Sequence, residues 1–495
     1  MAKVAVRRFA AAGVGFGTSG VRATVDALTD EVSFAYARAF LQVLERGGAL
    51  QPRGAVALGH DLRPSSPRIT AACVAACWAA GARPVLCGAI PTPAVAFYAL
   101  QARVPAIMIT GSHIPFDRNG IKFYRASGEI LKEDEAAIAA AEVEVDAEVF
   151  DERGALRAPP ALPSVEPTAR AMYLRRYLDF FPEGVLHGRR VGVYEHSSLA
   201  RDLAKEALAA LGAEVVSLGR TDTFVPIDTE AVSEADQRQA ERWVAEHRLD
   251  ALVSTDGDSD RPLVGDERGS YLRGDAVGML CAGYLGAATV VTPVSSNTAV
   301  ERWGRFRRVV RTRIGSPYVI AAMEEAARAG DASVVGYEAN GGFLLGSPVQ
   351  RRSASGARTL APLPTRDAML PMLAILCMAA ERGCRVSQLM EGLPERFTAS
   401  DRVQEVPTAA SRALLDQLSA DEAARTAFFG PVGKVSEVNR VDGVRVTLDG
   451  GDVVHLRPSG NAPELRCYAE AATPTRAAEL CRWGLGAAAA RVRST

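Results

Sequence analysis

The sequence predicts an α/β protein in which three similar mixed-sheet α/β domains precede a smaller α+β C-terminal domain. Its length of 495 residues is enough for about three or four domains. Short apolar strands alternate with helical stretches through most of the first 385 residues. From about residue 400 the chain instead shows successive strand patterns with few helices. These observations predict four domains of two kinds.

The first domain is predicted at residues 1–157. Short apolar runs separated by helical stretches indicate parallel strands joined by helices. These runs are residues 55–59, 84–87 and 105–109. An acidic, alanine-rich stretch leads into the proline-rich segment 158–163, so we place the first boundary near residue 157.

The second and third domains are predicted at residues 158–270 and 271–392, with the same alternation of strands and helices. The expected strands are 190–194, 213–218, 289–292, 308–311 and 333–336. Units of similar length suggest three related domains, although the sequence shows no strong internal repeat. A tract rich in proline and threonine at 360–365 precedes a long apolar helix that ends near residue 382.

The fourth domain is predicted at residues 393–495. Its expected strands are 433–438, 443–448, 453–456 and 465–469, and a helix begins near residue 474. A helix near residues 409–418, several strands in succession and a terminal helix indicate a small α+β unit.

Composition excludes several classes of protein. The chain is 48% hydrophobic and 23% charged, which is ordinary for a globular protein. A net charge of -1 gives no broad basic surface, so we expect no nucleic-acid partner. The apolar stretches are too short for a membrane span, and no signal peptide is evident. We therefore expect a cytoplasmic protein without a membrane partner, whose eight scattered cysteines are reduced.

The most informative motif is Thr110-Gly-Ser112-His113-Ile-Pro115, which follows the apolar run 104–109. The turn places one hydroxyl at the end of a strand, where open α/β sheets carry their chemistry. A tight polar turn without chemistry is the alternative.

A second motif places three carboxylates at alternate positions: Asp256, Asp258 and Asp260. Gly257 allows the backbone to turn tightly, so that the three side chains converge on one hard cation such as Mg²⁺. A solvated acidic turn is the alternative. A helix-loop-helix calcium site does not fit, because its glycine stands at the sixth position and Gly257 is second.

Three further turns have polar side chains suited to a phosphorylated sugar. Arg457 and Arg466 flank the turn Ser459-Gly460-Asn461, whose N–H groups could bind an anion. Arg22 follows a turn of glycine, serine and threonine. Glu338-Ala-Asn340-Gly-Gly follows a strand and offers partners for sugar hydroxyls. The alternatives are surface turns and, for the last one, a β-hairpin.

In this order and spacing, the motifs resemble the α-D-phosphohexomutase family, which includes phosphomannomutase, phosphoglucomutase and phosphoglucosamine mutase. The resemblance extends over the whole chain and includes residues 59–66, 91–94 and 119–122. It implies four domains around a central cleft. It also implies interconversion of hexose 1-phosphate and hexose 6-phosphate, with mannose as the expected sugar and glucose as a second candidate. Mg²⁺ is the expected cofactor, and hexose 1,6-bisphosphate the expected intermediate and activator.

The resemblance also implies a role for each motif residue. Ser112 would carry a phosphoryl group and join Asp256, Asp258 and Asp260 around the metal. Lys122 would accept a proton, with its pKa lowered by nearby cations. The other implied catalytic residues are Arg22, which would stabilise the transferring group, and His113, which would orient the serine loop or donate to a phosphate. The implied substrate or phosphate ligands are Arg261, Arg313, Glu338, Asn340, Arg457, Ser459, Gly460, Asn461 and Arg466.

The sequence leaves three alternatives open. Gly342 stands in the sugar loop where the family usually has a histidine, so the preferred sugar is uncertain and phosphoglucosamine mutase remains a rival. A non-catalytic protein with this fold is a second alternative. A Mg²⁺-dependent sugar phosphatase with a nucleophile in the Asp256 loop is the third, and it would not need Ser112.

Overall fold

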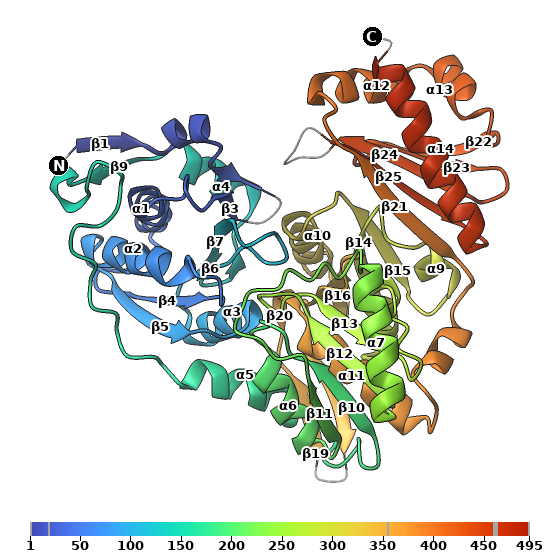
Figure 1. The fold of residues 1–495 in the computed structure, drawn as a ribbon, viewed down its shortest axis with the longest axis horizontal. Helices are drawn as coiled ribbons and strands as arrows, with labels where there is room; N and C mark the ends of the chain where they lie inside the picture. Colours follow the sequence, from blue (N-terminus) through green and yellow to red (C-terminus); the bar gives the residue numbers. More distant parts are fainter. Residues whose placement is uncertain (1, 18–19, 354–355, 459–463, 494–495) are drawn as a thin grey trace.

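The computed structural model describes residues 2–17, 20–353, 356–458 and 464–493. Four α/β units follow one another along an arc, from the N-terminal unit to the C-terminal unit (Figure 1). Each unit contains one large sheet. In the described part of the chain, no helix is long and apolar enough to cross a membrane.

The first unit has a mixed sheet in the order β2-β3-β7-β6-β4-β5. Its strands are β2 (Gly15–Phe16), β3 (Val21–Thr24), β4 (Ala55–His60), β5 (Arg83–Gly88), β6 (Ala106–Ile109) and β7 (Arg118–Arg125). Its main helices are α1 (Asp30–Arg46), α2 (Ser66–Ala79) and α3 (Thr92–Ala102). Strand β6 is buried along its whole length, as expected for a strand covered on both faces.

The second and third units have mixed sheets in the orders β11-β10-β12-β13 and β15-β14-β16-β17-β20. Their strands are β10 (Arg190–Tyr194), β11 (Glu214–Leu218), β12 (Ala251–Thr255), β13 (Pro262–Gly265), β14 (Thr289–Pro293), β15 (Arg308–Thr312), β16 (Val334–Tyr337), β17 (Phe343–Leu345) and β20 (Leu363–Asp367). Their helices are α5 (Thr168–Leu178), α6 (Arg201–Ala210), α7 (Glu234–His247), α8 (Gly274–Tyr284), α9 (Ala299–Arg302), α10 (Ser316–Arg328) and α11 (Met369–Glu381).

The three units share one four-strand core. In each, a first strand pairs in parallel with the second and third, and the fourth runs antiparallel to the third. The prediction of three similar mixed-sheet units is therefore confirmed. The segment between the third and fourth strands contains Ser112 in the first unit, Asp256 in the second and Glu338 in the third. The repeated topology thus places the three motifs in equivalent turns.

The C-terminal unit is a different, antiparallel sheet in the order β21-β25-β24-β23-β22. Its strands are β21 (Phe397–Val403), β22 (Val435–Asn439), β23 (Val444–Leu448), β24 (Val453–Pro458) and β25 (Leu465–Ala471), and its helices are α12 (Thr408–Ala420), α13 (Glu422–Phe429) and α14 (Pro474–Arg493). Helices α12 and α14 pack their leucines against Val454 and Leu456. The predicted α+β unit is confirmed.

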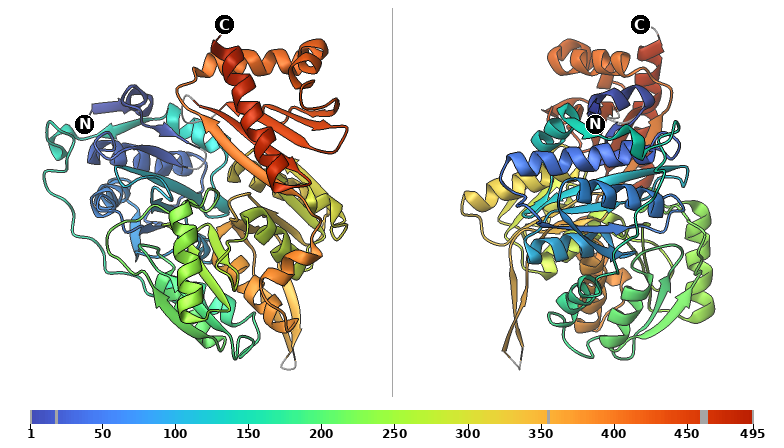
Figure 2. Two further views of the ribbon diagram at one scale, coloured as in Figure 1. Left: turned by 45° about the vertical axis from the view of Figure 1, so that its right-hand side comes forward. Right: turned by 90° about the vertical axis from the view of Figure 1, so that its left-hand side faces the viewer.

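The first three units also share a hydrophobic core, because one buried cluster contains residues of α3, α5, α8 and α11. Smaller elements complete the chain: β1 (Ala2–Ala5), β8 (Gly128–Glu129), β9 (Glu142–Val145), α4 (Lys132–Ala140), and the 3-10 helices Val6–Ala12, Ala147–Val149 and Ser387–Gly392. Strands β18 (Val349–Ser353) and β19 (Gly356–Leu360) form a ribbon that projects from the body (Figure 2).

Strand β20 was not predicted. Its residues include part of the tract rich in proline and threonine, and Pro364 lies within it. Proline is tolerated here because β20 is an edge strand, where one side of the backbone needs no donor.

Candidate active site

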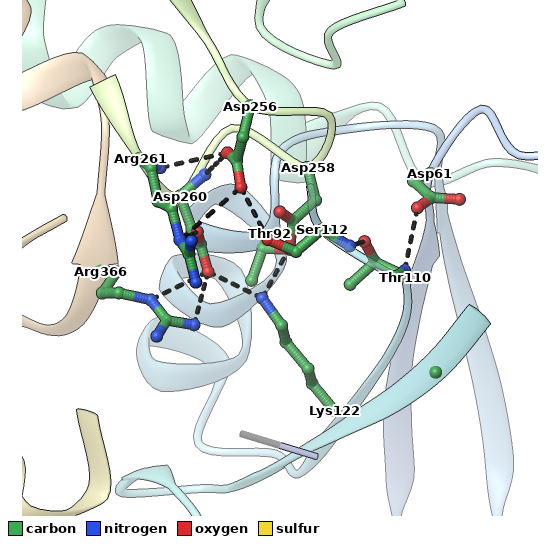
Figure 3. A network of polar contacts seen from close by, with 12 residues as sticks. Asp61, Thr92, Thr110, Ser112, Lys122, Asp256, Asp258, Asp260, Arg261 and Arg366 are labelled. Carbon is green, nitrogen blue, oxygen red and sulfur yellow. Dashed lines mark hydrogen bonds and ion pairs between the residues drawn. The ribbon is translucent and has the colours of Figure 1, made fainter. Parts of the chain in front are cut away.

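Ser112 lies buried in the turn after β6, with a φ of 56° in the left-handed region. Its backbone N–H donates to Thr110 Oγ1 at 2.8 Å, and this bond fixes the turn. The Ser112 hydroxyl donates to Asp256 Oδ2 at 2.7 Å (Figure 3), and His113 Nδ1 lies 3.3 Å from the same hydroxyl oxygen. The turn therefore points its hydroxyl at the acidic motif of the next unit.

Arg63 stabilises the backbone of this turn. Its buried guanidinium donates to the carbonyl oxygens of Ser112, Ile114 and Pro115 at 2.9, 2.5 and 2.6 Å. Asp61 neutralises Arg63 at 3.1 Å and also accepts the N–H of Gly111. The planar guanidinium of Arg63 binds several backbone carbonyls of the Ser112 turn at once, so this buried ion pair fixes the turn. The point charge of a lysine would not match that arrangement of acceptors.

Asp256, Asp258 and Asp260 are all buried, and one oxygen of each lies within 4.8 Å of the others. Among the described residues, Asp258 Oδ1 and Asp260 Oδ1 have no hydrogen-bond partner. A Cβ added to Gly257 would lie 3.0 Å from the carbonyl oxygen of Ser112, so glycine permits the close approach of the two loops. Buried carboxylates with unpaired oxygens beside a hydroxyl suit a hard divalent cation.

Lys122 on β7 contacts two of these carboxylates. Its Nζ donates to Asp258 Oδ2 and to Asp260 Oδ2, each at 2.7 Å (Figure 3). Burial lowers the pKa of Lys122, but attraction to Asp258 and Asp260 outweighs burial and raises the pKa above its ordinary value. The prediction of a lowered Lys122 pKa is therefore wrong for this arrangement, because attraction to the two carboxylates is stronger than repulsion from Arg366.

The electrostatics of the three carboxylates favour an added cation. Burial, followed by repulsion from Asp258 and Asp260, raises the pKa of Asp256 well above its ordinary value. Burial acts in the same direction on Asp260, but Arg366 and Lys122 outweigh it and lower that pKa. Three buried negative charges repel one another unless positive charge lies among them.

The predicted cations Arg22 and Arg261 lie near the same centre. Burial, with repulsion from Arg261 and Arg366, lowers the pKa of Arg22 to about 10. Repulsion from Arg261, then burial and Arg22, lowers the pKa of His113 far below its ordinary value. The imidazole is therefore neutral at physiological pH, so His113 contributes a hydrogen bond rather than a charge.

The turn between β16 and β17 is both a β-hairpin and part of this site. Glu338 N donates to Gly342 O at 3.1 Å, which closes the hairpin. The carboxylate of Glu338 accepts from Arg366 at 3.1 Å, whereas Asn340 Oδ1 accepts from Gly342 N within the turn. Glu338 thus lies next to the acidic motif, while Asn340 shapes its own loop.

The predicted phosphate ligands of the C-terminal unit are only partly described. Arg457 and Arg466 are directly opposite on β24 and β25, and Arg402 of β21 continues the row. Arg457 Nε lies 3.4 Å from Asp442, and Arg466 donates to Glu464. The structure therefore presents a row of arginines at this end of the sheet. Ser459, Gly460 and Asn461 lie outside the described residues.

The face of this sheet that carries Arg457 and Arg466 also borders a polar pocket. Because side chains alternate along a strand, His455 points away from the helices that cover Leu456. The pocket is lined by residues from the second, third and fourth units, among them Glu230, Arg273, Ser295, His455 and Tyr468.

Arg313 contacts the C-terminal unit, because its Nε donates to Val441 O at 3.0 Å. Its guanidinium also lies over the ring of Tyr318 in its own unit, and the side chain is exposed. The structure therefore brings Ser112, Lys122 and the three aspartates together but places Arg313 at the junction of two units.

Comparisons with known proteins match three of the four units by family model and more than nine-tenths of the chain by relatives. Residues 13–148, 273–397 and 395–482 match domain I, domain III and the C-terminal domain described for phosphoglucomutase/phosphomannomutase. A phosphomannomutase of Salmonella muenchen is 46% identical over 462 residues, which cover 93% of this chain and 92% of the relative. The chain belongs to the phosphoglucomutase/phosphomannomutase family. The family predicted from the motifs is confirmed, and the chain is a mutase, an intramolecular phosphotransferase.

Other similar proteins support the same family assignment. A phosphomannomutase of Sinorhizobium fredii is 45% identical over 95% of this chain and 98% of the relative. A phosphoglucosamine mutase of Cereibacter sphaeroides is more distant, with 30% identity over 92% of this chain and 94% of the relative. A solved phosphoglucomutase/phosphomannomutase family protein of Burkholderia thailandensis superposes with a TM-score of 0.72 at 22% identity, covering 96% of this chain and 97% of that one.

The structure of the mutase brings into the site two residues to which the sequence analysis gave no role, although residues 91–94 were part of the resemblance. Arg366 donates to Asp260 at 2.7 Å, and Thr92 donates to Asp258 at 2.6 Å (Figure 3). The prolines around both residues obscured their setting, because proline is read as loop rather than as strand or helix start. Only the contact across units identifies them.

The segment 194–198 supports the metal motif within the second unit. His196 Nε2 lies 2.8 Å from Thr255 O, and Ser198 Oγ lies 2.6 Å from Thr255 Oγ1 and 3.0 Å from Ser259 Oγ. These buried contacts fix the end of β12, from which Asp256 projects. The segment thus supports the acidic loop from within the second unit.

Proposed function

We propose that this mutase interconverts hexose 1-phosphate and hexose 6-phosphate, with mannose as the main sugar and glucose as a second substrate. The reaction would pass through phosphorylated Ser112 and a hexose 1,6-bisphosphate. The observation that carries the proposal is the 2.7 Å contact between Ser112 Oγ and Asp256, with Lys122 against the other two aspartates. The names of the two relatives at 45% identity or more support mannose.

Asp256, Asp258, Asp260 and a Ser112 oxygen would hold Mg²⁺, and hexose 1,6-bisphosphate would act as activator. Within the described residues, Asp258 Oδ1 and Asp260 Oδ1 accept no hydrogen bond, which supports a cation at this place. When bound, Mg²⁺ neutralises charge on the transferring phosphoryl group. The remaining chemistry is positioning, since phosphoryl transfer needs little covalent help from the protein.

In the transfer step a sugar hydroxyl attacks the phosphorus, and the bond from phosphorus to Ser112 Oγ breaks with its electron pair left on Oγ. The hydroxyl proton moves to Lys122 Nζ, and a proton returned to Oγ restores the Ser112 hydroxyl. Pairing with Asp258 and Asp260 holds a proton on Lys122. Lys122 can therefore accept a proton only when those carboxylates are engaged elsewhere. Arg22 and Arg261 would stabilise the transferring group, and His113 would orient the Ser112 hydroxyl as a neutral partner.

The remaining predicted residues would bind the substrate. Glu338 would accept sugar hydroxyls. The other proposed ligands of the sugar and of its non-reacting phosphate are Arg313, Asn340, Arg457, Ser459, Gly460, Asn461 and Arg466. We further propose that residues 1–157, 158–270, 271–392 and 393–495 act as four domains around a substrate cleft, in a cytoplasmic enzyme without nucleic-acid or membrane partners. One large sheet in each segment supports this division.

Mass analysis of the Ser112 peptide tests the proposal. The purified protein is incubated with Mg²⁺, mannose 1-phosphate and a trace of hexose 1,6-bisphosphate. The expected result is a phosphate adduct on Ser112 and formation of mannose 6-phosphate, both absent from Ser112→Ala. Glucose and glucosamine phosphates under the same conditions rank the sugars. Release of inorganic phosphate by Ser112→Ala at the wild-type rate would instead indicate a phosphatase.

A further inference from the structure

Arg366 links the acidic loop of the second unit to the Glu338 hairpin of the third. Its Nη2 and Nε donate to Asp260 Oδ2 at 2.7 and 3.0 Å, and its Nη1 donates to Glu338 Oε2 at 3.1 Å. The side chains of all three residues are at most 5% exposed. One planar guanidinium therefore fixes two carboxylates from different domains in one geometry.

Gly342 leaves room for the side chain of Arg366. A Cβ added to Gly342 would lie 2.6 Å from Cδ, 2.8 Å from Cγ and 3.1 Å from Cβ of Arg366. These atoms form the stem of the arginine, which cannot move aside without displacing the guanidinium from both carboxylates. The φ of Gly342 lies outside the left-handed region, so backbone conformation does not require glycine. Glycine is instead required here because the Arg366 side chain occupies the space that a Cβ would take.

The contact pattern also decides which carboxylate oxygens Arg366 engages. Both donors to Asp260 reach Oδ2, and Asp260 Oδ1 has no hydrogen-bond partner among the described residues. The single donor to Glu338 reaches Oε2. Arg366 thus leaves a second oxygen of each carboxylate outside its own hydrogen bonds. Burying Glu338 without this cation would leave an uncompensated charge.

We propose that Arg366 is the positioning residue for Glu338, which fixes the sugar-reading carboxylate relative to the carboxylates around Ser112, and that Gly342 lacks a side chain to admit it. This inference rests on the proposed function of Glu338. Rotation or loss of the guanidinium would free the hairpin from the acidic loop. The sugar would then be held less firmly in one orientation, although every group that contacts it would still be present.

A double-mutant cycle on sugar binding tests the link. The Ser112→Ala background prevents turnover, and calorimetry measures the Kd of mannose 1-phosphate with Mg²⁺ present. Arg366→Lys keeps the positive charge but lacks the planar guanidinium that binds both carboxylates. We expect it to raise Kd about tenfold, roughly 1.4 kcal/mol. Glu338→Gln should weaken binding similarly, and adding Arg366→Lys to it should change Kd less than about twofold. Arg328→Lys, at an exposed position of α10, is the matched control.

Losses that multiply in the double variant would show that Arg366 acts independently of Glu338 and would overturn the inference. A wild-type Ser112 adduct together with an unchanged Kd in Arg366→Lys would also overturn it, while leaving the proposed function intact. Absence of both the adduct and any hexose phosphate binding would overturn the proposed function itself.

A second cycle tests the packing pair without any ligand. Gly342→Ala should lower Tm by about 5 °C in the wild-type protein, because the new methyl group meets the Arg366 stem. In an Arg366→Ala background, Gly342→Ala should lower Tm by less than half of that amount. Gly450→Ala, where a Cβ has no atom within 4 Å, is the control. Equal losses in both backgrounds would show that Gly342 is not shaped by Arg366.

Discussion

Lys122 Nζ lies 2.7 Å from Asp258 Oδ2, although 136 residues of sequence separate the two side chains. The lysine thereby places a positive charge among the three carboxylates that are suited to a divalent cation. A cation that binds there competes with Lys122 for the negative charge of the same two carboxylates. Binding of the metal and release of the lysine are thus linked events in this site.

Replacing Lys122 by methionine should affect metal binding and turnover in opposite directions. Without the competing ammonium group, Mn²⁺ should bind about tenfold more tightly, roughly 1.4 kcal/mol, in titrations followed by electron paramagnetic resonance. Mutase turnover should fall about 100-fold or more, because the proton acceptor is lost. Lys132→Met, which removes an ion pair with Glu135 outside the triad, should change neither. Weaker Mn²⁺ binding by Lys122→Met would contradict the competition.

The left-handed φ of Ser112 predicts a difference between two inactive variants. Ser112→Gly and Ser112→Ala both remove the hydroxyl, but only glycine adopts a φ of 56° without strain. We expect Ser112→Gly to be more stable than Ser112→Ala by about 1 kcal/mol in urea unfolding. Equal stability, or a more stable alanine variant, would mean that the turn relaxes once the hydroxyl is removed.

Removing Arg63 should destabilise the Ser112 turn. Arg63→Met leaves Asp61 buried without its cation and several turn carbonyls without their donor. We expect a loss of roughly 3–5 kcal/mol in the free energy of unfolding. Arg83, exposed at the start of β5, gives the control Arg83→Met, expected within about 0.5 kcal/mol of wild type. A small loss at Arg63 would show that the turn is stable without the arginine.

His196 should make the protein sensitive to acid. Burial lowers the pKa of His196 from 6.5 to about 4, so the unfolded chain binds the proton more readily than the folded chain. Stability contributed by the neutral imidazole is present above pH 6.5 and is lost as pH falls towards 4, with a limit of roughly 3 kcal/mol.

Urea unfolding at several pH values measures this contribution. His196→Gln keeps a hydrogen-bonding side chain without the titration, so its stability should fall less than that of wild type between pH 6.5 and pH 4. The exposed His187 gives the control His187→Gln, whose profile should follow wild type. Parallel profiles for His196→Gln and wild type would exclude His196 as the source.

Local patterns in the sequence predicted much of this site because its motifs are short. Ser112 follows a buried apolar strand, and the spacing of Asp256, Asp258 and Asp260 places three carboxylates in one turn. The Asn340-Gly341 pair predicted a hairpin, which is present between β16 and β17. In contrast, β20 was missed because Pro364 lies in its sequence, and no local pattern distinguishes an edge strand from a loop when proline is present.

By itself the sequence determined which chemical groups are available, the four-unit α/β organisation and the family. Strand periodicity, turn residues and motif spacing are local properties of the chain, so they can be read before folding. Tertiary structure alone decided that Lys122 pairs with Asp258 and Asp260, and that Arg366 joins Asp260 to Glu338. The contacts of Lys122 with Asp258 and Asp260 and of Arg366 with Asp260 join residues more than 100 positions apart. The contact of Arg366 with Glu338 joins β20 to the turn after β16 within the third unit. Their burial sets the direction of each pKa shift, and no local pattern contains that burial.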